Sequence, residues 1–116
     1  MSHQRIRAHL CEVAQTAQPI TYQALAKALG LTPPNTIHQL TMALETLIEE
    51  DAERDRPLIA ALVISKARGG LPAPGFFDCA KRVGVFDGDA TGADATAFYE
   101  VEFGRAVAFW QAHSAA

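Results

Sequence analysis

The chain has 116 residues, of which 49% are hydrophobic and 20% charged, and its formal net charge is −3. This composition is typical of one globular domain, excludes disordered and fibrous proteins, and argues against a general nucleic-acid coat. No stretch approaches the roughly 20 apolar residues of a membrane span, and the N-terminus has no apolar run of signal-peptide length. We therefore expect a cytoplasmic protein without membrane contact. Cys11 and Cys79 lack zinc-site or disulfide spacing, so we expect buried, reduced thiols.

Charge alternates in blocks along the chain. Residues 1–40 carry three basic side chains and one acidic one, and residues 41–57 carry two basic and six acidic ones. Residues 58–82 then carry four basic side chains and one acidic one, and residues 83–116 carry one basic and five acidic ones. The two positive blocks can therefore contact phosphates although the whole chain is acidic.

The first two predicted helices are short. Apolar residues recur at three- and four-residue spacing over residues 3–16, which predicts an amphipathic helix with Ser2 as its cap. These apolar residues are Ile6, Leu10, Val13 and Ala14. Thr21 is an expected N-cap for a second helix, in which Ile20 packs against Leu25. Gly30 is expected to end this helix.

A third helix is predicted to follow directly. Thr32 and Pro33 form a start signal, because a proline in the first turn loses only an amide that has no partner within the helix. The expected apolar stripe comprises Ile37, Leu40, Leu44, Leu47 and Ile48. We expect the helix to run to about Glu50 and to fray there, since the acids that follow oppose the helix dipole. The segment "EEDAERDR" is interpreted as a solvated helix end and linker.

The C-terminal half alternates apolar segments with glycine-rich loops. The run "PLIAALVIS", residues 57–65, predicts a buried strand, and the Gly/Pro-rich residues 66–75 predict a loop. The segment "FFDCAKRVG" predicts a short helix ending at Gly84. From Asp94 to about His113 the pattern predicts a long helix with a wide aromatic face. That face either packs on its own core or forms a two-fold dimer interface. The dimer-interface candidates are Phe98, Tyr99, Phe103 and Trp110.

The segment "ITYQALAKALGL" and the order helix, helix, turn, long helix, strand and Gly/Pro loop resemble bacterial winged helix-turn-helix domains over residues 3–75. The resemblance implies a mainly α (α+β) fold, which a helical C-terminal extension, residues 76–116, follows within one domain. The C-terminal extension lies outside the resemblance and is predicted from the sequence pattern alone. For residues 3–75 the resemblance also implies that the helix after the turn enters the major groove of duplex DNA, with the loop Lys66 to Pro74 as the wing along the backbone. A small regulator of transcription or an accessory factor, acting as a homodimer, is the expected function.

Two groups of residues are DNA-binding candidates. The exposed side of the third helix offers amide and imidazole groups that can pair with base edges, namely Asn35, His38 and Gln39. This helix has no Lys or Arg, so phosphate contacts must come from elsewhere. The candidate phosphate anchors are Arg5, Arg7, Lys27, Lys66 and Arg68. The alternative is a winged-helix adaptor that binds another protein and no DNA.

The same segment also distantly resembles the DNA-binding domain of alkylguanine-DNA alkyltransferases. Those enzymes carry a Pro-Cys-His-Arg nucleophile motif, whereas Cys79 lies in "FDCAKR" without a following His. No other catalytic arrangement is evident, so we expect neither an enzyme nor a cofactor.

Two loops invite ligand interpretations. The glycines between Lys66 and Gly75 could direct amides at an anion, but a wing tip or a simple turn is the preferred explanation. In "DGDATGAD" the spacing starts like a calcium loop, but position twelve is Phe98, so we expect turn and cap residues and no metal.

Overall fold

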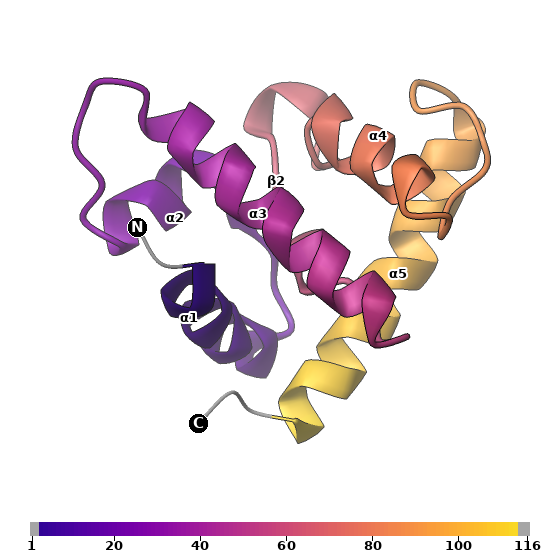
Figure 1. Ribbon diagram of the computed structural model, residues 1–116, viewed down its shortest axis with the longest axis horizontal. Helices are drawn as coiled ribbons and strands as arrows, with labels where there is room; N and C mark the ends of the chain where they lie inside the picture. The colour runs from indigo at the N-terminus through magenta and orange to yellow at the C-terminus, as the bar shows by residue number, and fades with distance from the viewer. Residues whose placement is uncertain (1–2, 114–116) are drawn as a thin grey trace.

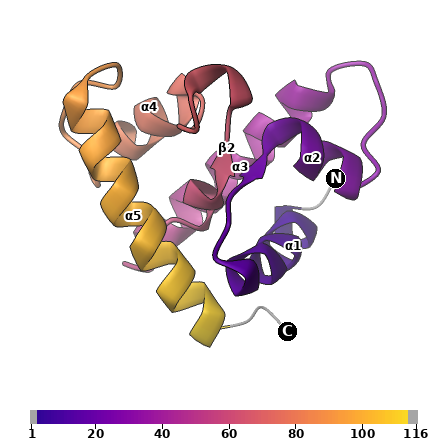
Figure 2. The ribbon, with the colours of Figure 1, turned by 180° about the vertical axis from the view of Figure 1, so that it is seen from behind.

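The computed structural model describes residues 3–113, and it confirms the expectation of a mainly α-helical protein (Figures 1 and 2). The elements in chain order are α1 (His3–Thr16), β1 (Ile20–Thr21), α2 (Tyr22–Ala28), α3 (Thr36–Glu53), the 3-10 helix η1 (Ile59–Leu62), β2 (Val63–Ile64), the 3-10 helix η2 (Lys66–Arg68), α4 (Pro74–Arg82) and α5 (Ala93–Ala112).

Helix α3 crosses the front of the molecule in Figure 1, with α1 and α2 toward one end and α4 and α5 toward the other. The strands β1 and β2 pair in parallel behind it, with Ile20 opposite Val63. Buried apolar side chains from all five α-helices form one contiguous cluster. Because η1 contacts α1, α3 and α5, the segment between α3 and β2 lies in the middle of this core.

The predicted bounds of α1 and the predicted N-cap and end of α2 are confirmed. Thr21 caps α2 by accepting a hydrogen bond of 3.1 Å from the amide of Ala24. Gly30 follows the helix end at a φ of +69°, in the left-handed region that glycine adopts most easily. The predicted cap Ser2 lies outside the described residues.

The predicted start of the third helix was wrong. Helix α3 begins at Thr36, after Pro33, Pro34 and an Asn35 with a φ of +62°. A residue that precedes a proline is disfavoured in the α region, so Pro33 cannot readily start a helix when Pro34 follows it. Ile37 is 43% exposed and does not join the stripe, whereas the other four predicted stripe residues are buried.

The predicted end of this helix was also wrong, because α3 continues past Glu50 to Glu53. The acids that were expected to fray it are held by cations. Glu50 pairs with Arg7 at 3.0 Å and with His3 at 2.7 Å. Asp51, expected in a solvated end, is fully buried. These partners stabilise the last turns against the unfavourable interaction with the helix dipole.

The predicted strand over residues 57–65 is wrong in large part, because Ile59–Leu62 form a 3-10 helix and only Val63–Ile64 form a strand. Two buried carboxylates explain this. Asp51 accepts from the amide of Ile59 at 3.0 Å, and Glu102 accepts from the amide of Leu58 at 2.7 Å. These amides are therefore not available to a neighbouring strand, and β1 offers only two residues for pairing.

The two C-terminal helices occur where expected, although α4 starts two residues early, at Pro74. Gly84 follows α4 at a φ of +84°. The rings of Phe76, Phe77, Phe86 and Phe98 contact one another between α4 and α5. An aromatic cluster of this kind joins the two elements of the C-terminal region to the core.

Candidate nucleic-acid interface

The α2–turn–α3 unit presents one side of α3 to solvent. Asn35, His38, Gln39 and Met42 are all exposed, and Thr46 is half-buried. The three predicted base-contacting residues therefore do lie together on the outer side of the first turns of α3. His38, Gln39 and Met42 also line one open, shallow hollow between α3 and the start of α1.

The two amide side chains on this surface differ in their bonding. Gln39 donates from Nε2 to the carbonyl oxygen of Pro34 at 3.2 Å, which leaves it a second N–H and a carbonyl oxygen. Asn35 is the N-cap of α3, but its left-handed backbone gives no side-chain capping bond. The first amides of α3 thus lack the side-chain cap that a helix N-terminus usually has.

Four of the five predicted phosphate anchors carry charges without an ion-pair partner in the part of the chain that the structure describes. They are Arg5, Lys27, Lys66 and Arg68. Lys27 lies in the last turn of α2, and Lys66 and Arg68 lie in η2. Figures 1 and 2 place the start of α3 and the loop after β2 at the same upper end of the molecule.

The prediction of Arg7 as a phosphate anchor is wrong, because this residue is only 4% exposed. Its Nη1 donates to Asp51 at 2.8 Å and its Nη2 donates to Glu50 at 3.0 Å. The guanidinium also lies 5.1 Å from the ring centre of Trp110. A buried cation with two carboxylate partners is not available to a DNA phosphate.

Most of the acidic side chains of α3 form ion pairs within the protein. Arg82 of α4 donates to Glu49 at 2.7 Å and lies 3.8 Å from Glu45. Glu50 and Asp51 have the partners described above. Only Glu53 of this helix has no recorded ion pair within residues 3–113. The negative block of residues 41–57 therefore contributes much less to the field around α3 than its sequence suggests.

The predicted wing is a short closed loop. The two ends of the loop are joined by a hydrogen bond of 2.8 Å, which the amide of Ser65 donates to the carbonyl oxygen of Leu71. Gly69 and Gly70 follow η2 with positive φ values of 65° and 92°. The loop is tied to α2 because the amide of Ala73 donates to the hydroxyl of Tyr22 at 3.0 Å.

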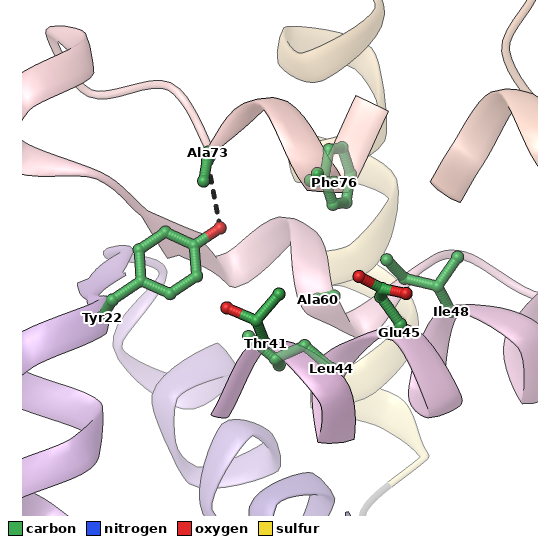
Figure 3. A pocket seen from close by; sticks show the side chains of 9 residues that line it. Tyr22, Thr41, Leu44, Glu45, Ile48, Ala60, Ala73 and Phe76 are labelled. Carbon is green, nitrogen blue, oxygen red and sulfur yellow. Dashed lines mark hydrogen bonds between the residues drawn. The ribbon is translucent and has the colours of Figure 1, made fainter. Parts of the chain in front are cut away.

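Figure 3 shows a cleft beside α3 into which this loop end and α4 also project. Its apolar lining includes Leu44, Ile48 and Phe76, and its volume is about 50 Å³. Burial raises the pKa of Tyr22 at the edge of the cleft, although the hydrogen bond from Ala73 and the charge of Arg68 oppose this. Sequence reasoning did not find this cleft, since its walls come from four separate parts of the chain, at residues 22, 41–48, 60 and 73–76.

The predicted dimer-interface residues lie mostly within the protein's own core. Tyr99 and Trp110 are buried, and Trp110 donates from Nε1 to the carbonyl of Pro57 at 3.1 Å. Phe98 and Phe103 are half-buried and contact rings of the same chain. The prediction of Tyr99 and Trp110 as dimer-interface residues is therefore wrong, because these side chains pack in the protein's own core and are not available to a partner. Homodimer formation itself stays a prediction.

The remaining candidates are structural in character. Both cysteines are buried, as predicted, and burial raises the pKa of Cys79. In the acidic loop, Asp89 accepts from the amide and the hydroxyl of Thr91 at 2.9 and 2.8 Å, and these bonds lower its pKa. Asp89 is thus a turn residue, as expected, but the expected side-chain cap of α5 is wrong, because the N-cap is Gly92 and no side chain caps the helix. Within the described residues, no helix is both long and apolar enough to cross a membrane.

No protein-family model, no curated protein and no solved structure matches this chain. We therefore infer the function from the geometry and chemistry of the α2–α3 surface.

Proposed function

We propose that the protein binds duplex DNA through α3, as a small regulator or accessory factor with a winged helix-turn-helix architecture. One observation carries this proposal. The acids along most of α3 are paired within the protein, whereas Arg5, Lys27, Lys66 and Arg68 have no recorded ion pair in the described chain. Uncompensated cations around a helix with exposed amides suit a polyanion with readable base edges.

The winged-helix assignment is supported by the position of the loop after β2. Because Tyr22 holds this loop through Ala73, the cations of η2 are tied to the start of α2. Helix α2 would then cross the backbone, α3 would enter the major groove, and the loop would follow the neighbouring phosphates. The uncapped N-terminal amides of α3 would add a further contact for a phosphate.

The expected footprint is modest. Four phosphate contacts would give a slope of log affinity against log salt of about −3.6, at roughly 0.9 per contact. Arg7 is not counted among the four phosphate contacts because it is buried. Binding should therefore be measurable at low salt and weaken steeply as the salt concentration rises.

Fluorescence anisotropy with a mixed-sequence duplex at several salt concentrations tests the proposal. The double variant Lys66→Ala/Arg68→Ala should lower affinity and reduce the magnitude of the slope by about 1.8. Arg54→Ala is the matched control, because Arg54 is an exposed cation at the opposite end of α3. Absence of binding at low salt, or an equal loss in the Arg54 variant, would contradict the proposal.

A protein-binding adaptor is the second candidate, favoured by the apolar cleft of Figure 3. An apolar side chain of a partner would enter between α3 and the start of α4. This function does not use the cations of η2. Salt-sensitive DNA binding that requires Lys66 and Arg68 would therefore favour the first candidate over this one.

A further inference from the structure

The exposed side chains at the start of α3 have a restricted chemistry. Asn35 and Gln39 are carboxamides, and Met42, one turn further, is a thioether chain that is 56% exposed. From Thr32 to Asp51 the sequence contains no Lys or Arg. The surface that would face a DNA groove therefore offers paired donor–acceptor groups and an apolar contact, but no fork of cationic donors.

This chemistry matches one class of base pair. In the major groove adenine presents an acceptor, N7, beside a donor, N6–H, and one carboxamide can satisfy both. Thymine presents a C5-methyl group, which an apolar side chain can cover. Guanine presents two acceptors, N7 and O6, which require two donors such as an arginine fork, and a carboxamide would place its own oxygen against one of them.

From these groups we infer that α3 reads A·T base pairs in the major groove and discriminates against G·C. The inference rests on the proposed duplex-DNA function and specifies its substrate. Gln39 is held by its bond to Pro34 and retains one N–H and its carbonyl oxygen for adenine. Met42 lines the same hollow as Gln39, so a methyl group of a neighbouring thymine can be covered there. His38 donates to N7 of either purine and does not choose between them.

Anisotropy measurements at one low salt concentration with duplexes of equal length test the inference. We expect an A·T duplex to bind at least about fivefold more tightly than a G·C duplex. Uracil in place of thymine removes only the methyl group and should weaken binding by about fourfold. An inosine·cytosine duplex, which has the minor groove of A·T but the major-groove acceptors of G·C, should bind like G·C.

Variants show which residues produce the preference for A·T base pairs. Gln39→Ala and Asn35→Ala should reduce the A·T preference while the salt slope stays unchanged. Met42→Ala should abolish the difference between thymine and uracil. Gln18→Ala, which removes an exposed glutamine before β1, is the matched control and should change neither. Circular dichroism verifies that each variant is folded.

The outcomes separate the two proposals. If no duplex binds, the proposed function fails. If all duplexes bind equally, DNA binding stands and the A·T inference is overturned. Inosine·cytosine binding as tight as A·T would also overturn it, because the preference would then come from the minor groove.

Discussion

The guanidinium of Arg7 and the carboxylate of Asp51 form an ion pair of 2.8 Å although they lie 44 positions apart in the sequence. Asp51 is fully buried and also accepts from Nε of Arg56 at 2.6 Å and from the amide of Ile59. Both guanidinium groups lie about 5 Å from the ring centre of Trp110. This arrangement joins α1, the end of α3, the following loop and α5. Its buried polar contacts fix how these elements pack against one another.

Asp51→Asn should destabilise the protein by about 3 kcal/mol, because two arginines then lose their buried counter-charge. Urea unfolding followed by circular dichroism measures the change. Glu49→Gln is the matched control, since it removes a carboxylate from an exposed ion pair with Arg82 and should leave the unfolding midpoint nearly unchanged. Equal effects of the two variants would show that Asp51 is not structurally special.

Stability should depend on pH through Glu50. Partial burial raises the pKa of Glu50, but hydrogen bonds from Arg7 and His3 outweigh it, so the pKa lies below its usual value. A lowered folded-state pKa stabilises the protein above the unfolded value of about 4.3, and this contribution is lost as pH falls through the folded pKa. The stability difference between wild type and Glu50→Gln should therefore shrink from about pH 6 to about pH 3. A pH-independent difference would contradict this explanation.

The cap of α2 should be measurable on its own. Thr21→Ala removes the oxygen that accepts from the amide of Ala24, at an expected cost of about 1 kcal/mol in the free energy of unfolding. Thr21→Ser keeps this oxygen and should recover most of the loss. If Ser is no better than Ala, the side-chain methyl group of Thr21, and not its hydroxyl, contributes the stability.

Trp110 is the only tryptophan and reports on the packing of α5. Because it is buried in its own chain and bonded to Pro57, its emission maximum should be that of a buried indole and should not change on dilution. Fluorescence over a thousandfold range of protein concentration, on the order of micromolar downward, checks this. A red shift on dilution would mean that subunit contact is required to bury the indole.

Local patterns predicted the helices well where each cause lies within a few residues. The cap at Thr21, the turn at Gly30 and the periodic apolar residues of α1 and α5 required no distant partner. The predicted start of α3 was wrong although its cause is local, because Pro34 disfavours the α region for Pro33. The exposure of His38 and Gln39 was predicted correctly, since helical periodicity determines which residues share a side. Asn35 is exposed too, but it precedes the helix with a left-handed backbone, so periodicity does not place it.

Long-range partners decided the rest. The burial of Arg7 and Asp51, the 3-10 helix in place of a strand at residues 59–62, and the packing of Trp110 within its own chain all depend on contacts across 40 or more positions. The sequence by itself determined a mainly helical protein, its short helices and the chemistry exposed on α3. Only the tertiary structure decided which charges are compensated inside the protein and which remain available, because ion pairing depends on distance in space and not on distance along the chain.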